Sequence, residues 1–317
     1  MNDAAPSTPA TPPTSAAASC LIGERGGFRW YHVTDPKGPA LDELAAQYGL
    51  HELAIEDCRN HRQRAKLEDY DSHIFVIFNS IHFEPEKKEC WFREIDFFVG
   101  KDFMITVREG PTPSRTIASA LPKFRADAKM AHPGRLLETM LDFMVDQYLP
   151  VLDTVEDRIE QLEEQVLENP TPALLSDIFA LRRALIDYRR VALAGREVIN
   201  HLLYRTEPWF RTRQPYFRNI YDHIVRALDF AETYRDILTG VLDVHLSATA
   251  NRTNEIMKRL TFWATVAIPF LLVTGFFGMN FGNLPWLGNS MGWVYASLAM
   301  ALAGVAMAAY FKSRGWF

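Results

Sequence analysis

One short segment near residue 280 carries the residue types best suited to chemistry with a cation. Thr274 to Phe281 reads TGFFGMNF, with Gly275, Gly278 and an amide side chain at Asn280. Glycines let neighbouring backbones approach closely, and a ring of copies would gather the amide oxygens into a neutral collar. A small divalent cation such as Mg²⁺ sheds water reluctantly, so a collar that binds its hydration shell suits it. Glycine and asparagine are also common turn residues, and the segment taken alone favours a turn.

The sequence offers little support for catalysis. It contains no G-x-x-x-x-G-K-[ST], G-x-G-x-x-G or H-E-x-x-H motif, and His51 is better explained as a surface or hydrogen-bonded residue than as a ligand. Cys20, Cys58 and Cys90 are scattered without C-x-x-C spacing, so neither a disulfide framework nor a structural zinc site is indicated. We expect a reducing compartment and no enzyme activity.

Charge is distributed very unevenly along the 317 residues. Every Asp and Glu lies at or before Glu255, and no charged residue lies between Arg259 and Lys312. The net charge of −5 argues against nucleic acid as the main partner and is compatible with a domain that handles cations. The apolar tail must therefore be a different kind of structure from the polar front part.

The apolar tail predicts two membrane spans, 260–279 and 291–311, joined by an outer loop at 280–290. Each run has about the 20 residues that cross ~30 Å of hydrocarbon as a helix. The alternative is a buried core hairpin, but core helices seldom run so far without a charge. Residues 259–317 are thus expected to form a transmembrane domain.

Basic residues flank the two predicted spans and set their orientation. Lys258 and Arg259 precede the first, Lys312 and Arg314 follow the second, and the loop between them carries no charge. The positive-inside rule then places both termini in the cytoplasm and the loop outside, in a cell inner (plasma) membrane. Two helices cannot enclose an aqueous path, so a conducting protein of this kind must oligomerise.

The front part predicts an α/β domain over 20–130, preceded by a disordered Ala/Pro/Ser/Thr-rich tail at 1–19. Runs of β-branched and aromatic residues predict strands, and Gly100-Lys101-Asp102 predicts a hairpin between the last two. The expected strands are Phe28 to Val33, Ile74 to Phe83, Ile95 to Val99 and Phe103 to Val107. Helices are expected near Leu41 to Tyr48, Glu52 to Cys58 and Pro113 to Lys129.

Residues 131–258 predict long helices and a stalk. Leu136 to Glu168 has apolar residues at three- and four-residue spacing, with a kink expected at Pro150, and a second helix should run from Pro172 to about Arg205 and pack antiparallel to it. From residue 215 to 279 only Pro269 interrupts helical character, so one helix about 100 Å long is expected to run from the cytoplasm through the membrane.

Gly278-Met279-Asn280, at the end of the first of two C-terminal spans, resembles the signature of the CorA magnesium-transporter family. The basic, Trp-containing ending after Tyr310 is also similar to that of the family. The resemblance covers about residues 20–317. Further segments that resemble the family are Leu53 to Asp57, Lys66 to Tyr70, Tyr216 to His223, Leu242 to Leu246 and Asn251 to Lys258.

The resemblance implies a funnel-shaped homopentamer whose pore is lined by the first span and the stalk. It implies that Gly278, Met279 and Asn280 select the ion, and that Asn254 and Asn280 form polar rings. Further along the pore, apolar residues would gate by dewetting. The pore-lining residues that it implies are Asn254, Met257, Leu260, Ala264, Ile268, Leu271 and Gly275.

In the family, cytoplasmic Mg²⁺ bound between subunits holds the pore closed, and the resemblance carries this role to Asp243, with Asp222 nearby in sequence. Two departures from the family pattern stand out. Asn219 occupies a position where members often have Asp, which puts that regulatory site in doubt. The outer loop lacks the Pro-Glu pair that brings an acid to the mouth in many members.

The function expected from this resemblance is gated Mg²⁺ influx, with Co²⁺ or Ni²⁺ as lesser substrates. The alternative within the superfamily is Zn²⁺ transport, as in the ZntB branch; Met279 favours the magnesium branch, whereas the uncharged loop weakens that preference. A third hypothesis is a membrane-tethered regulatory protein that does not conduct. The expected partners are further copies of the chain and membrane lipid.

Overall fold

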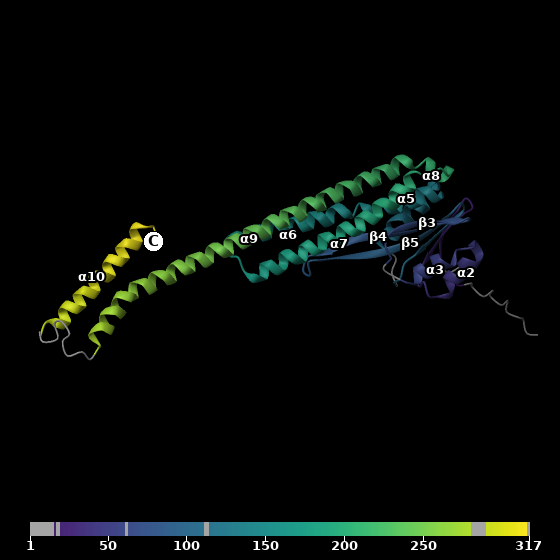
Figure 1. Ribbon diagram of the computed structural model, residues 1–317. Helices are drawn as coiled ribbons and strands as arrows, with labels where there is room; N and C mark the ends of the chain where they lie inside the picture. Colours follow the sequence, from purple (N-terminus) through teal and green to yellow (C-terminus); the bar gives the residue numbers. More distant parts are fainter. Residues whose placement is uncertain (1–15, 17–19, 61–62, 111–113, 280–289, 316–317) are drawn as a thin grey trace, which may run out of the picture. The chain divides into compact units, whose positions relative to one another are not determined.

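The computed structural model describes residue 16 and residues 20–60, 63–110, 114–279 and 290–315 (Figure 1). It divides into two compact units. The first comprises Met1–Gln165 and Thr171–Leu242, and the second comprises Val166–Pro170 and Asp243–Phe317. Asn280, most of the predicted outer loop, Pro113 and most of the predicted tail lie outside the described residues.

A six-stranded sheet with the order β1-β2-β6-β5-β4-β3 is the centre of the first unit. Only β2 and β6 pair in parallel, and the other neighbours are antiparallel. The predicted hairpin is confirmed, and β4 and β5 are each longer than predicted. The strands are β1 (Leu21–Arg25), β2 (Phe28–Val33), β3 (Lys66–Asp69), β4 (His73–Glu84), β5 (Glu89–Gly100) and β6 (Phe103–Val107).

The sheet is covered by helices on both faces. On one face α2 (Pro39–Tyr48) and α3 (Glu52–Arg59) bury Leu41, Leu44 and Ile55 against the strands. The opposite face packs against the other helices: Phe124 contacts Trp30 edge-on, at 5.5 Å between ring centroids. Figure 1 shows the labelled strands between α2 and α3 on one side and α5 and α7 on the other. Helix α4 (Arg115–Ala126) and the 3₁₀ turn η1 (Ala128–Met130) complete this layer.

The helix predicted over Leu136 to Glu168 is interrupted, so the prediction of one helix was wrong. The chain forms α5 (Pro133–Val145) and α6 (Tyr148–Glu168) instead. Pro150 has no N–H for the carbonyl four residues earlier, and its ring collides with that carbonyl, so a continuous helix is disfavoured at residue 146. In the first turn of α6 the missing N–H removes no intrahelical bond.

Helix α7 (Pro172–Leu203) returns along α6, as predicted. The Tyr188 hydroxyl donates to the Tyr148 carbonyl, at 3.1 Å, and the Tyr148 hydroxyl donates to the Asn79 carbonyl of β4, at 2.7 Å. Gly195 lies where a Cβ would be 3.1 Å from the ring of Phe78, so its small size lets α7 approach the sheet. These contacts fix the helices to the strands.

After a short helix α8 (Pro208–Arg211), one helix of 64 residues, α9 (Gln214–Phe277), confirms the predicted long helix. In the first unit α9 buries an apolar face that includes Phe217, Ile224 and Leu238. In the second unit it continues beside α10 (Gly292–Ser313). The second unit also includes the end of α6, and Arg252 donates to the Asn169 side chain there, at 2.9 Å.

Candidate functional site

Helix α10 packs against one face of the apolar part of α9. The rings of Phe262 and Phe311 meet edge-on, with 5.7 Å between centroids. Nearer the other end of the hairpin, a Cβ added to Gly304 would lie 3.2 Å from the ring of Phe270, so the two helices approach closely at this glycine. The two helices are therefore antiparallel and in direct contact.

The apolar residues predicted to line a pore lie on the opposite face of α9. At about 100° per residue, Phe262 and Phe270 lie about 160° and 240° around the helix from Ala264. Leu260, Ile268 and Leu271 lie within about 40° of Ala264. The exposed fractions of Met257, Leu260, Ile268 and Leu271 are 54%, 63%, 48% and 69%, and Asn254, Ala264 and Gly275 are exposed as well.

These helices do not behave as a buried core hairpin. Both α9 and α10 are long and apolar enough to cross a membrane, and in their most apolar 18-residue stretches only 0% and 11% of the residues are buried. Contiguous exposed apolar surface of this kind is rare on soluble monomers, so lipid or further protein chains must cover it.

Two of the three predicted selectivity residues, Gly278 and Met279, directly follow the end of α9. Helical hydrogen bonding continues past Phe277, because the Gly278 N–H donates to the Thr274 carbonyl at 2.9 Å and the Met279 N–H to the Phe276 carbonyl at 3.3 Å. Met279 is half exposed. Asn280, the third residue, lies outside the described residues. Gly278 and Met279 are thus an extension of the helix that carries the apolar stripe.

At the other end of the stripe, Asn254 and Met257 line one hollow of about 540 Å³ on the second unit. Lys258, Asn251 and Thr261 contribute to the same hollow. Its lining is polar apart from the methionine and the stems of the longer side chains. The predicted polar ring at Asn254 is therefore adjacent to the first apolar position.

Neither predicted regulatory acid belongs to a preformed metal site among the described residues. Asp222 and Asp243 are both exposed on α9, and so is Asn219. The one group of three or more metal-ligating side chains found in the described parts consists of Asp142, Asp146 and His223, whose ligand atoms lie within 4.8 Å of one another. Asp222 is the sequence neighbour of this group, not a member.

The Asp142–Asp146–His223 group was missed by the sequence analysis. Asp142 and Asp146 are one helical turn apart at the end of α5, and His223 Nδ1 lies 3.5 Å from Asp146 Oδ1. Burial raises the pKa of Asp142, and the charge of Asp146 raises it further. The four-residue spacing of Asp142 and Asp146 predicts that both lie on one face of a helix, but nothing in the sequence indicates that His223 of α9 contacts them.

Two of the segments that resembled the family meet in the first unit. Lys66 of β3 binds Asp57 of α3, at 2.6 Å, and Glu68, at 2.7 Å. His51, expected to be hydrogen-bonded and not a ligand, accepts from the Leu53 N–H at the start of α3, at 3.2 Å, and stacks on Tyr70. Both segments thus have structural partners within the chain.

Known proteins resemble this chain over nearly its whole length. The family of CorA-like Mg²⁺ transporter proteins matches residues 25–313. A cobalt/magnesium transport protein CorA of Thermotoga maritima is 32% identical, with 90% of this chain and 83% of that protein covered. A putative metal ion transporter, YfjQ of Bacillus subtilis, is 32% identical, with 93% and 92% covered.

Solved structures agree with the fold. The complete structure of the CorA magnesium transporter of Methanocaldococcus jannaschii superposes with a TM-score of 0.78 at 24% identity and covers 92% of each chain. The ZntB cytoplasmic domain of Vibrio parahaemolyticus covers 72% of this chain and 88% of its own, with a TM-score of 0.55 at 16% identity. Because the family match spans most of the sequence and includes both apolar helices, the chain belongs to the family of CorA-like Mg²⁺ transporter proteins.

Proposed function

We propose that this chain carries divalent metal cations, chiefly Mg²⁺, across a membrane as one subunit of a homopentameric channel. The observation that carries the proposal is the exposed stripe on α9, which lies on the face turned away from α10. If several copies turn this face inward, α10 faces lipid and the stripe surrounds a path that neither helix could enclose alone.

Each part of the stripe has a distinct role in this proposal. Asn280 would bind the hydration shell of the ion at the outer mouth, with Gly278 and Met279 holding it there. Met257, Leu260 and Ile268 would close the path by dewetting, and Ala264, Leu271, Gly275 and the polar ring of Asn254 would line the rest.

With both termini cytoplasmic in the inner membrane, the inside-negative membrane potential drives cation uptake. Each elementary charge that crosses gains about 2.3 kcal/mol per 100 mV, so a divalent ion gains about 4.6 kcal/mol per 100 mV. Asp243 and Asp222 remain our candidates for a regulatory Mg²⁺ between subunits, with Asn219 weakening that site. Co²⁺ and Ni²⁺ are the expected lesser substrates, and Zn²⁺ is the alternative cargo.

Ion flux into liposomes tests the proposal directly. Reconstituted wild-type protein should pass Mg²⁺, and Asn280→Ala should lose flux or selectivity. Leu260→Asn should raise flux through the closed state, because a polar side chain lets water enter an apolar constriction. Leu302→Asn is the matched control, since Leu302 lies on α10 and its exposed fraction of 62% is close to the 63% of Leu260.

The outcomes separate the alternatives. Flux of Zn²⁺ without flux of Mg²⁺ would refute Mg²⁺ as the transported ion and favour Zn²⁺ transport, as in the ZntB branch. Absence of any divalent flux, with no effect of Asn280→Ala, would favour a membrane-tethered protein that does not conduct. Equal effects of Leu260→Asn and Leu302→Asn would refute the assignment of the stripe to the pore.

A further inference from the structure

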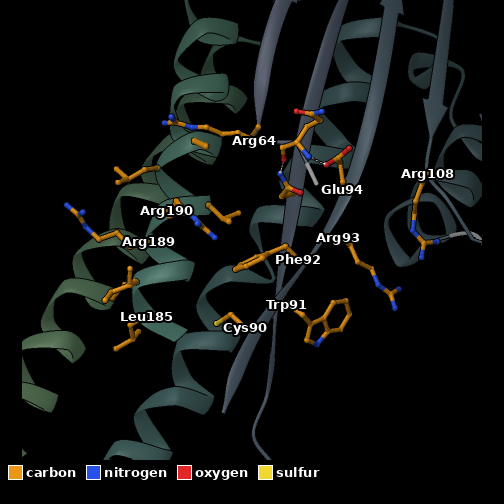
Figure 2. Close-up of a pocket in the computed structure, with 18 of the residues that line it drawn as sticks. Arg64, Cys90, Trp91, Phe92, Arg93, Glu94, Arg108, Leu185, Arg189 and Arg190 are labelled. Atoms are coloured by element: carbon orange, nitrogen blue, oxygen red, sulfur yellow. Dashed lines mark hydrogen bonds between the residues drawn. The ribbon is translucent and has the colours of Figure 1, made fainter. Parts of the chain in front are cut away.

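A large cavity in the first unit has no role in the proposed ion path. It has a volume of about 1110 Å³ and lies among β5, α7 and the part of α9 near Arg235 (Figure 2). Strand β5 pairs with β6 only from Asp96 to Val99, so the half of β5 that begins at Glu89 has no described strand on that side. The cavity includes this half of the strand.

Arginine dominates the charged lining of the cavity. Among the residues that the structure describes, the lining has two acids, Glu94 and Glu109, and six arginines, which are Arg64, Arg93, Arg108, Arg189, Arg190 and Arg235. In Figure 2 the side chains of Arg64, Arg189 and Arg190 lie on the side of the strands that faces the helices, with Arg64 above the other two, whereas Arg93 and Arg108 lie on the other side. The cavity therefore presents an excess of positive charge, concentrated at the helical side.

Three of these arginines, Arg64, Arg93 and Arg189, form no ion pair with a described residue, and Arg64 and Arg189 are the two on the helical side. Arg190 binds Asp187 at 3.0 Å, and Arg235 binds both Glu232 and Asp236. Arg64 and Arg189, in contrast, are exposed and form no ion pair with any part of the chain that the structure describes. A guanidinium group carries five N–H donors in a planar fork that matches phosphate oxygens in pairs.

The remaining lining is mostly apolar. Phe92 and Cys90 extend from β5 toward α7 in Figure 2, and Leu185 faces them from α7. Burial, with the nearby Asp187, raises the pKa of the Cys90 thiol to about 12, so this sulfur is neutral and a poor nucleophile or metal ligand. The cavity thus has the character of a binding site for an anion with an apolar part, not of a catalytic or metal site.

We propose that this cavity binds a nucleoside polyphosphate in its metal-free form, with the phosphates on Arg64 and Arg189 and the base against Phe92. A monoanion such as a carboxylate would compensate only one of the two arginines, Arg64 and Arg189, whereas a triphosphate carries several charges along a short chain. Arginines here supply the countercharge that Mg²⁺ gives the nucleotide in solution, so the uncomplexed nucleotide has the larger charge complementarity. The proposal does not depend on ion transport, because all lining residues belong to the first unit.

Calorimetric titration of the purified full chain in detergent with ATP, in EDTA and without divalent ions, tests the proposal. We expect saturable binding that weakens when excess Mg²⁺ complexes the nucleotide. Arg189→Ala and Arg64→Ala should each weaken binding about tenfold to a hundredfold, the range for loss of one charge-assisted hydrogen bond. Arg183→Ala is the matched control, because Arg183 is also exposed on α7 but lies outside the cavity.

Further titrations separate the phosphate and base contributions. Phe92→Ala should weaken ATP binding but leave binding of inorganic tripolyphosphate unchanged. Arg189→Lys keeps the charge without the planar fork, so an intermediate affinity is expected even if the alanine variant folds poorly.

Several results would overturn the assignment. They are the absence of saturable ATP binding, equal affinities of the Arg183→Ala and Arg189→Ala variants, or tripolyphosphate binding as tight as that of ATP. Tighter binding of the Mg²⁺ complex would refute the metal-free form.

Discussion

Replacing Glu138 with alanine should destabilise the first unit severely, because it leaves a buried arginine without its partner. The Arg213 guanidinium, just before α9, donates to the Glu138 carboxylate of α5, and the two side chains are only 16% and 8% exposed. Arg213 also lies over the ring of Tyr216, 3.6 Å from its centroid. Removing one member of a buried pair costs about 3–5 kcal/mol, since the remaining charge stays desolvated.

The intact pair itself contributes little net stability. Burial raises the pKa of Glu138, and the hydrogen bond and charge of Arg213 only partly oppose that rise. A carboxyl group with a raised folded-state pKa stabilises the fold below its unfolded pKa, and that contribution is lost as the pH rises through the folded pKa. Replacing both members, as Glu138→Leu with Arg213→Met, should therefore be neutral or stabilise by about 1–4 kcal/mol.

Thermal unfolding of the full chain in detergent distinguishes these expectations. At about 2–4 °C per kcal/mol, Glu138→Ala should lower Tm by about 6–20 °C, and the double variant should unfold near or above the wild type. Glu197→Ala is the control, because Glu197 pairs with Arg196 at the surface and such pairs contribute under about 1 kcal/mol. The reasoning fails if Glu138→Ala and Glu197→Ala shift Tm equally, or if the double variant falls as far as Glu138→Ala.

Three further substitutions have defined expectations. Gly134→Ala should abolish folding or lower Tm strongly, because its Cβ would lie 2.0 Å from the Trp209 carbonyl oxygen; an unchanged melting curve would contradict that packing. Gly240→Ala should stabilise α9 by about 0.5–1 kcal/mol, measured by thermal unfolding, because its Cβ would meet nothing within 4 Å; destabilisation would contradict the open environment. Burial, reinforced by the charge of Glu94, holds the pKa of Asp96 well above its usual range, so ionisation of this carboxyl should lower Tm as the pH rises. Asp96→Asn should flatten the dependence of Tm on pH, and an equally steep profile in the variant would refute the role of Asp96.

The main elements of the fold were predictable because their residues have strong periodicity or composition. The long helix α9 and the apolar helix α10 were predicted from uninterrupted apolar and helical sequence. Strands β1 and β3 were missed, because both are short, charged and at the two edges of the sheet, where most of their side chains are only partly buried. Edge strands of this kind are defined by their pairing partner more than by their own sequence.

The effect of Pro150 was predicted at the wrong position, because the helix is interrupted between α5 and α6, before the proline itself. The apolar spacing continues across residues 146 and 147, so periodicity alone favours one helix. Pro150 was recognised as a source of bending, but its effect lies at the carbonyl four residues earlier, which is where the helix stops.

The candidate pore face could not be separated from its neighbours by sequence, because apolar residues occur all around this part of α9. The contacts of Phe262 and Phe270 with α10 distinguish the two faces, and those contacts depend on a second helix whose rotation the sequence does not specify. The Asp142–Asp146–His223 group could not be predicted for a similar reason, because His223 comes from a distant part of the chain and meets the two acids only through tertiary packing.

The exposed apolar residues of α9 begin before the predicted membrane boundary, which bears on what covers them. Lys258 and Arg259 mark the expected cytoplasmic end of the span, yet Leu246, Ile256 and Met257 precede them with exposed fractions of 55%, 57% and 54%. Lipid can cover Leu260 and the residues beyond it, but side chains on the aqueous side of the basic pair need another protein surface. The proposed oligomer supplies that surface with a further copy of the same helix, so the contact between copies should extend out of the membrane along α9.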